Sequence, residues 1–365
     1  MYIENYIIRL TGSKACGNAA REILEKTSHM IKARSVAWGA VRCIFSARLV
    51  EEMGVGGGFR SVVPGKGSLV HQILALAFPR LYLDHRSSIV SGELSGIDYK
   101  EYVNEAVETL EELGLLSIRP IDQRTRDAAV RDSTIMLYEA ATALYELFGR
   151  LGMDPERTRV YTEMHLMSYK LHVRGVVDAL IEDAVSRKAI IIEWKTGEAQ
   201  ETPSIDDPDI AQAIIYALLE AERLDYSDVS KAVIEGNIVP VIIRPKGRIT
   251  RYCISPVYTT ARRTVDIKNL IYKLILASEH LTLITTDIRR FIGKNLDKLC
   301  RSGRGSAFRR APDDLPRGNP RKEPPSWPCK ACAIRDECLF YLFTYEDPDE
   351  VDKLAWRTRF AIYAY

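Results

Sequence analysis

Two apolar segments joined by a short polar turn place the strongest constraint on the fold of this chain. Branched apolar residues dominate residues 173–181 and return at 190–192, and the mostly polar residues 182–188 separate them. Such a density of branched side chains is typical of strands that are covered on both faces. The stretch 171–195 therefore predicts two neighbouring buried strands, around which the rest of the chain is organised.

Charged residues interrupt this apolar stretch. Asp178 lies inside the first predicted strand, and Glu193 and Lys195 lie two residues apart in the second. Because side chains alternate along a strand, Glu193 and Lys195 project from one face and Trp194 from the other. Two buried carboxylates need a positive neighbour, so we expect a divalent metal held by oxygen ligands, with Lys195 as a second positive charge. A structural ion pair is the alternative interpretation.

These residues resemble the PD-(D/E)XK nucleases, and in particular their RecB-like branch. The motif of that family, G-h-x-D followed by a turn and h-h-(D/E)-x-K, matches residues 175–178 and 191–195. The RecB-like branch adds a histidine on an upstream helix and a Q-x-x-x-Y motif on the helix after the second strand. The counterparts in this chain are His71, Gln212 and Tyr216.

The resemblance implies an α/β fold with a restriction-endonuclease-like core and metal-dependent hydrolysis of phosphodiester bonds in DNA. The implied ligands of magnesium or manganese are His71, Asp178, Glu193 and the backbone carbonyl of Trp194. Lys195 would orient the attacking water or offset charge in the transition state. Gln212 and Tyr216 are four residues apart on one helix face and would position the DNA strand.

Four of the candidate residues carry a second interpretation, which for Tyr216 is a core residue and for Gln212 a surface residue. His71 lies in an apolar predicted helix over residues 67–78, where a histidine is commonly a buried core residue, although the preceding Gly67-Ser-Leu-Val favours the ligand role. Glu163 lies in a predicted strand over residues 160–166. It either supports the metal through a water molecule or is a solvated strand residue, and the sequence leaves both interpretations open.

Seven cysteines, an odd number, argue against a disulfide framework and for metal ligation by some of them. Cys329, Cys332 and Cys338 form a C-x2-C-x5-C motif, whose thiolates converge on one ion or cluster. Zinc is the generic expectation. The pattern, however, resembles the iron–sulfur nucleases, which include the CRISPR-associated Cas-four exonucleases and the AddB-type repair nucleases. That resemblance implies a 4Fe-4S cluster held by these three residues and Cys43, with Cys300 as the rival fourth ligand.

Periodicity and composition suggest three regions in the 365 residues. Residues 1–66 form a helical segment that carries one cluster cysteine, residues 67–300 a nuclease core, and residues 301–365 a basic loop followed by the cysteine region. The core contains a helical insertion at about 99–152, which is either a lid or partner-binding subdomain or simple packing bulk. Three interpretations of the basic loop, residues 301–327, stay open: a segment that contacts phosphates, a disordered segment, or a run of charges that is simply exposed to solvent.

The remaining elements follow from apolar periodicity. Helical patterns cover residues 20–31, 36–50, 210–221, 260–278 and 285–299, and strand patterns cover residues 232–243 and 248–254. With the hairpin and the strand at 160–166, this order predicts a mixed central sheet flanked by helices. The cysteine-ligated region would join the N- and C-terminal parts to this core.

The chain lacks several features that would indicate other functions. The formal net charge of +2 does not by itself indicate a nucleic-acid-binding protein. No apolar run reaches the length of a membrane span, and residues 1–10 lack a secretory signal pattern. We therefore expect a cytoplasmic protein. The sequence contains no Walker motif, so it shows no helicase motor of its own.

The resemblance to the iron–sulfur nucleases, in a chain without a visible helicase motif, leads us to expect one of three roles. The first is the trimming of DNA with single-stranded ends during CRISPR spacer acquisition, with integrase subunits as partners and homo-oligomerisation left open. The others are a repair nuclease that works with a separate helicase, and a catalytically inactive subunit for DNA binding or assembly.

Overall fold

The computed structural model describes residues 30–41, 66–115, 121–197, 207–247, 249–255 and 267–285, together with Lys14, Asn18, Arg21, Glu22, Glu25 and Ala47. The chain divides into two compact units: residues 1–59, 167–174 and 269–365 form one, and residues 60–166 and 175–268 form the other. The predictions for the cluster cysteines, for the basic loop and for a helix at 285–299 lie outside the described residues. The candidate cluster ligands concerned are Cys43, Cys300, Cys329, Cys332 and Cys338.

A mixed sheet forms the centre of the fold, as the sequence predicts. Its strands are β1 (Ile31–Lys32), β2 (Arg159–Ser168), β3 (Val173–Asp183), β4 (Lys188–Trp194), β5 (Ile238–Ile243) and β6 (Arg251–Cys253). They follow the order β1-β3-β4-β5-β6, and β2 also pairs with β3. The β3–β4 and β5–β6 pairs are antiparallel, whereas β1–β3 and β4–β5 are parallel.

The predicted hairpin is confirmed. Strands β3 and β4 pair from Ala179 opposite Ile192 to Asp183 opposite Lys188. Ile190, Ile191 and Ile192 are all fully buried, as expected of a strand with both faces covered. The turn is therefore shorter than residues 182–188, because both of its ends belong to the strands.

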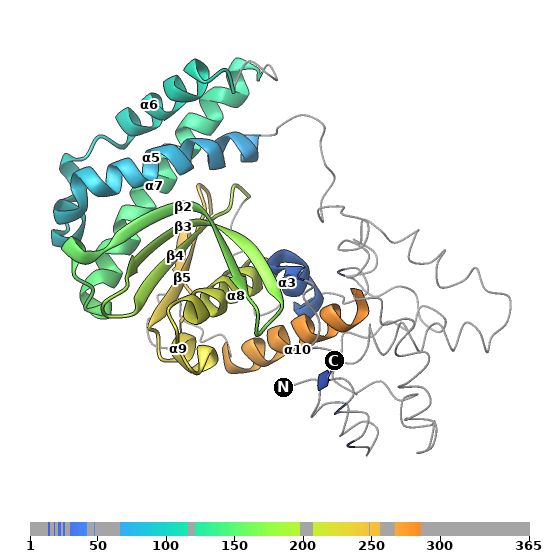
Figure 1. Cartoon of the computed structure of the whole chain (residues 1–365). Helices are drawn as coiled ribbons and strands as arrows, with labels where there is room; N and C mark the ends of the chain where they lie inside the picture. Colours follow the sequence, from blue (N-terminus) through green and yellow to red (C-terminus); the bar gives the residue numbers. More distant parts are fainter. Residues whose placement is uncertain are drawn as a thin grey trace, which may run out of the picture. The chain divides into compact units, whose positions relative to one another are not determined.

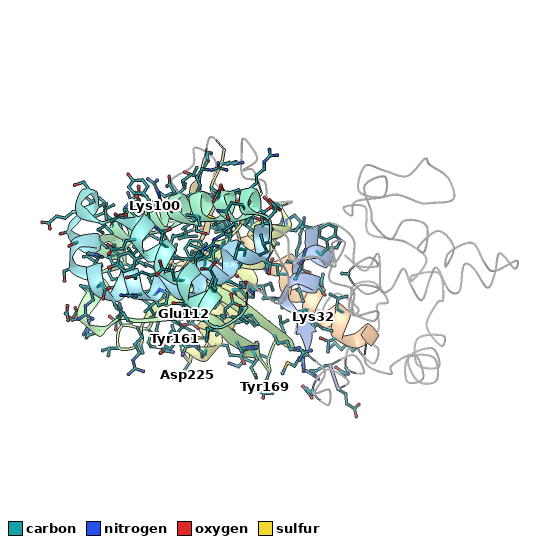
Figure 2. The ribbon with its side chains drawn as sticks, turned by 90° about the horizontal axis from the view of Figure 1, so that it is seen from above. Lys32, Lys100, Glu112, Tyr161, Tyr169 and Asp225 are labelled. Carbon is teal, nitrogen blue, oxygen red and sulfur yellow. The ribbon has the colours of Figure 1, made fainter. Side chains whose placement is uncertain are left out.

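Helices cover both faces of the sheet within the unit formed by residues 60–166 and 175–268. Helices α5 (Lys66–Ser91), α6 (Tyr99–Glu112) and α7 (Gln123–Leu151) lie on one side, and α8 (Pro208–Arg223) and α9 (Val229–Ile234) lie on the other (Figure 1). Figure 2 looks down on the three-helix layer, with Lys100 and Glu112 marking the first and last turns of α6. The two short 3₁₀ helices are η1 (Leu94–Gly96) and η2 (Pro155–Arg157).

The three-helix layer shares one hydrophobic core with the sheet. Phe78 and Tyr82 of α5 and Phe148 of α7 pack in the same cluster as Ile192 and Trp194 of β4. Helices α6 and α7 occupy most of the region at about 99–152, for which the sequence left two alternatives, a lid or partner-binding subdomain and simple packing bulk. Their burial in the core shows that this region contributes to the packing of the sheet.

Local sequence signals set the helix boundaries. The Asp98 side chain caps α6 by accepting hydrogen bonds from the backbone N–H groups of Lys100 and Glu101. Asp122 caps α7 in the same way, and α7 ends at Gly152, which has a left-handed φ of 61°. These residues satisfy backbone groups that a helix end leaves without partners.

Two secondary-structure predictions are wrong in part. The predicted strand at 232–243 is a helix, α9, followed by strand β5, because Asp228 caps α9 and Gly236 turns the chain with a φ of 74°. The helix predicted at 20–31 is wrong at its end, because Ile31 belongs to strand β1 and pairs in parallel with Val173. Helix α3 (Ala33–Val41) follows directly.

The last described helix is α10 (Ile267–Thr285), which agrees in type with the helix predicted at 260–278. None of the described helices combines the length and the apolar character that a membrane span needs.

Candidate active site

The hairpin places two acidic side chains next to each other. Continuing its register by one residue from the Ala179–Ile192 pair sets Asp178 opposite Glu193. Trp194 packs into the three-helix layer, with its ring 5.5 Å from that of Phe78, so Glu193 and Lys195 project from the opposite face. This confirms the alternation predicted from the sequence.

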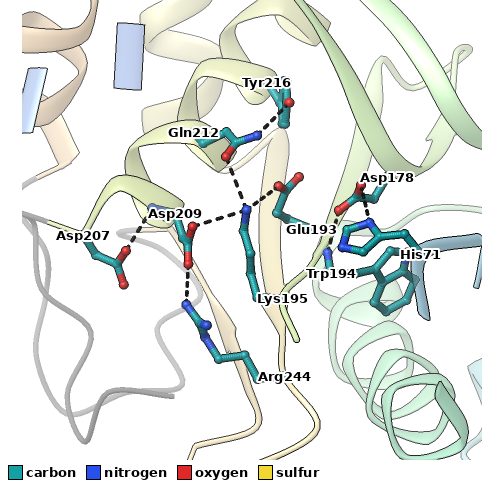
Figure 3. Close-up of polar contacts among 10 residues, drawn as sticks. All are labelled: His71, Asp178, Glu193, Trp194, Lys195, Asp207, Asp209, Gln212, Tyr216 and Arg244. Atoms are coloured by element: carbon teal, nitrogen blue, oxygen red, sulfur yellow. Dashed lines mark hydrogen bonds and ion pairs between the residues drawn. The ribbon is translucent and has the colours of Figure 1, made fainter. Parts of the chain in front are cut away.

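His71 and Asp178 are in direct contact (Figure 3). Nδ1 of His71, from the start of α5, lies 3.1 Å from Oδ1 of Asp178. The backbone N–H of Trp194 donates to Oδ2 of the same carboxylate over 2.8 Å. Burial works to lower the pKa of His71, but the hydrogen bond and the negative charge of Asp178 outweigh it and raise that pKa.

Glu163 joins this pair from strand β2. Potential ligand atoms of His71, Glu163 and Asp178 all lie within 4.8 Å of one another, a spacing that suits a metal ion. Glu163 has a φ of 50°, a left-handed conformation that is unusual and costly for a residue with a side chain. Burial and the charge of Asp178 raise the pKa of Glu163. Glu163 is exposed, as a solvated strand residue would be, and it also lies within ligand distance of His71 and Asp178, as the metal-supporting interpretation requires.

Glu193 is almost fully buried and has one oxygen to spare. Oε1 lies 2.8 Å from Nζ of Lys195, whereas the buried Oε2 has no hydrogen-bond partner among the described residues. Burial and the nearby charge of Asp178 raise the pKa of Glu193, and Lys195 opposes that rise. A buried carboxylate oxygen without a partner, opposite a second carboxylate, is what a divalent cation would stabilise.

The predicted metal ligands fit a divalent cation in part. Ligand atoms of His71 and Asp178 lie within 4.8 Å of each other and of Glu163, which the sequence analysis names as a supporting residue, whereas Glu193 does not belong to this group. Glu193 is close enough to Asp178 for the two charges to interact, and its Oε2 has no partner among the described residues. The Trp194 carbonyl stays a predicted ligand.

Lys195 is surrounded by acceptors. Its Nζ lies 2.8 Å from Oε1 of Glu193, 3.2 Å from Oδ1 of Asp209 and 3.3 Å from Oε1 of Gln212. Burial works to lower the pKa of Lys195, but the charges of Glu193 and Asp209 outweigh it and raise that pKa. The side chain is thus held as an ammonium at a defined point beside the acidic pair.

Gln212 and Tyr216 lie on one face of α8, as predicted. Nε2 of Gln212 donates to the hydroxyl of Tyr216 over 2.9 Å, while Oε1 of the same amide accepts from Lys195. The Q-x-x-x-Y pair is therefore connected to the E-x-K strand by a continuous hydrogen-bond chain (Figure 3).

Sequence reasoning missed two residues of this site, Asp209 and Arg244. Oδ2 of Asp209 accepts from Nη2 of Arg244 over 2.6 Å, while Oδ1 faces Lys195. Burial works to raise the pKa of Asp209, but the charges of Lys195 and Arg244 lower it overall. Arg244 directly follows the apolar strand β5, and this single charge at the end of a buried strand was the signal that could have drawn attention to it.

Comparison with known families places this geometry in context. Residues 40–338 match the family model described as the PD-(D/E)XK nuclease superfamily. The search among curated proteins found no match. The matched range contains both strands of the hairpin, His71 and the Q-x-x-x-Y pair, so the family match and the side-chain geometry concern the same residues.

Proposed function

Because the chain belongs to the PD-(D/E)XK nuclease superfamily, we propose that it hydrolyses phosphodiester bonds in DNA by metal-dependent catalysis. One observation carries this proposal. Asp178 and Glu193 directly adjoin the last paired residues of β3 and β4 and lie close enough for their charges to interact, with the Lys195 ammonium 2.8 Å from Glu193 and the His71 ring 3.1 Å from Asp178. An acidic pair with an adjacent fixed ammonium and an imidazole suits cleavage of an anionic ester better than a simple structural ion pair.

The side chains of the site divide the work. His71, Asp178 and Glu193, supported by Glu163, would hold a magnesium or manganese ion. Such an ion would act as a Lewis acid and lower the pKa of a bound water. The Trp194 N–H fixes one oxygen of Asp178 and leaves the other facing His71.

The next group acts on the substrate. Lys195 places a positive charge beside the acidic pair, where it can orient the attacking water or offset the charge that develops on the phosphate. Gln212 links Lys195 to Tyr216, and these two α8 side chains are the proposed positioning groups for the DNA strand, with Tyr216, which is only 4% exposed, acting through Gln212.

A narrower proposal concerns the substrate and the setting. We propose exonuclease action on DNA with single-stranded ends, in the cytoplasm, during CRISPR spacer acquisition and beside integrase subunits. Its support is the resemblance of the cysteine pattern to the iron–sulfur nucleases, with Cys43, Cys329, Cys332 and Cys338 as ligands of a 4Fe-4S cluster. Iron with acid-labile sulfide in anaerobically purified protein would support the cluster, and zinc alone would contradict it.

The substrate preference can be measured with DNA that differs only in its ends. We expect the full chain with Mn²⁺ to shorten end-labelled linear single-stranded DNA and to leave a circular single strand of the same sequence intact, because an exonuclease needs an end. EDTA should stop the reaction. Cleavage of the circle would contradict exonuclease action, and absence of cleavage on every DNA would contradict the nuclease function itself.

A further inference from the structure

Asp209 and Arg244 lie beside the catalytic lysine although no motif requires them. We propose that Asp209 is a positioning residue. Arg244 anchors Asp209, and Asp209 holds the Lys195 ammonium, so that the Glu193 carboxylate stays available to a divalent cation. The inference rests on the proposed metal-dependent function.

Lys195 is shared between charged and neutral acceptors. An ammonium has three N–H donors, and its three acceptors here are Glu193, Asp209 and Gln212. Of these, Glu193 and Asp209 carry charge. Without Asp209, Glu193 would be the one carboxylate paired with Lys195 among the described residues, and the ammonium and the cation would compete for the same oxygens.

Asp209 is held in place by contacts on its backbone and on both of its carboxylate oxygens. Its backbone N–H donates to the side chain of Asp207, the N-cap of α8, over 2.9 Å. Its location in the first turn of that helix favours a negative charge. Each of its oxygens has one cationic partner, Lys195 at 3.2 Å and Arg244 at 2.6 Å. The carboxylate therefore holds a fixed orientation toward Lys195.

Arg244 is itself buried and fixed at the end of β5. The side chain is only 7% exposed, and its backbone N–H donates to the Thr250 carbonyl over 2.7 Å. A buried arginine that donates to Asp209 makes this acid a built part of the site rather than a surface residue.

A merely structural ion pair between α8 and the end of β5 is the competing interpretation, and the two differ in what they change. Loss of a structural pair lowers the melting temperature and leaves metal affinity as it was. Loss of a positioning residue lets Lys195 pair more closely with Glu193, so metal affinity falls, and it falls only when Lys195 is present.

The test is the binding of Mn²⁺ to the full chain, followed by the electron paramagnetic resonance signal of free Mn²⁺, with DNA cleavage measured on the same preparations. We expect Asp209→Asn to weaken Mn²⁺ binding by about tenfold, the scale of one hydrogen bond to a charged group. In a Lys195→Ala background, the same substitution should change the affinity by less than about twofold, since the ammonium that Asp209 holds is absent.

Two further variants serve as controls. Asp228→Asn makes the same change at the exposed N-cap of α9, where asparagine caps equally well, and it should leave Mn²⁺ binding and cleavage as in the wild type. Asp209→Glu keeps the charge and should bind Mn²⁺ within about threefold of the wild type. It also keeps the test readable if Asp209→Asn does not fold.

Several outcomes would overturn the inference: wild-type Mn²⁺ affinity in Asp209→Asn, equal losses with and without Lys195, or a glutamate variant as weak as the asparagine variant. If the variants show the expected pattern of Mn²⁺ binding but the wild type cleaves no DNA, the proposed function is refuted and the role of Asp209 stands. If the wild type cleaves DNA but its Mn²⁺ affinity does not depend on Asp209, the role of Asp209 is refuted and the proposed function stands. A wild type that binds no Mn²⁺ would refute both.

Discussion

Lys195→Ala is expected to lower the rate of DNA cleavage by at least about a hundredfold, the usual effect of removing a preorganised group that stabilises the transition state. The substitution removes the ammonium that lies 2.8 Å from Glu193 and 3.2 Å from Asp209. Mn²⁺ binding should persist, because Lys195 is not a metal ligand and its loss removes a competing positive charge. The measurement is the initial rate of cleavage at saturating Mn²⁺.

The matched control for this variant is Lys231→Ala, at an exposed lysine that pairs with Glu235 on the helix surface. Such pairs contribute a few tenths of a kcal/mol, so the control should cleave DNA at the wild-type rate. Cleavage by Lys195→Ala within about threefold of the wild type would contradict the role given to the ammonium.

Trp194→Ala is expected to destabilise the fold by about 3–5 kcal/mol, the range for truncating a large buried aromatic residue. Trp194 is 1% exposed and packs edge-on against Phe78 of α5. Its removal opens a cavity between the sheet and the three-helix layer, directly behind the acidic pair. Urea unfolding followed by circular dichroism measures the effect.

Two comparisons calibrate the Trp194 result. Leu83→Ala, at a residue of α5 that is 56% exposed, should change the free energy of unfolding by less than about 0.5 kcal/mol. Trp194→Phe should cost less than the alanine variant, because it keeps an aromatic ring and removes an indole Nε1 that is buried without a partner among the described residues. A loss below about 1 kcal/mol for Trp194→Ala would show that the packing of Trp194 is unimportant for stability.

The parts of the site that sequence reasoning predicted are those that local patterns encode. Strand alternation put Glu193 and Lys195 on one face, and helix periodicity put Gln212 beside Tyr216, and both are confirmed by direct contacts. The hairpin followed from the density of branched apolar residues. The pairing of His71 with Asp178, 107 residues apart, came from the family resemblance and not from any local pattern.

The parts that were missed depend on tertiary structure. Asp209 follows the helix-initiating Pro208 and has the appearance of an ordinary first-turn acid, which gains its role only when α8 packs beside β4. Arg244 becomes part of the site only when β5 pairs in parallel with β4. The left-handed backbone of Glu163 has no signal in the sequence, because residues with side chains adopt that conformation only when their surroundings require it.

The most direct test of the central claim compares the wild type with Asp178→Asn in a single-stranded DNA cleavage assay, with Mn²⁺ and then with EDTA. The substitution keeps the shape of a side chain that is 12% exposed. It removes the negative charge that contacts His71, lies near Glu193 and would help to bind the proposed cation. We expect Mn²⁺-dependent cleavage by the wild type and a loss of at least about a thousandfold in the variant, with weaker Mn²⁺ binding. Equal cleavage by both proteins, or wild-type cleavage that persists in EDTA, would contradict a metal-dependent site at the hairpin.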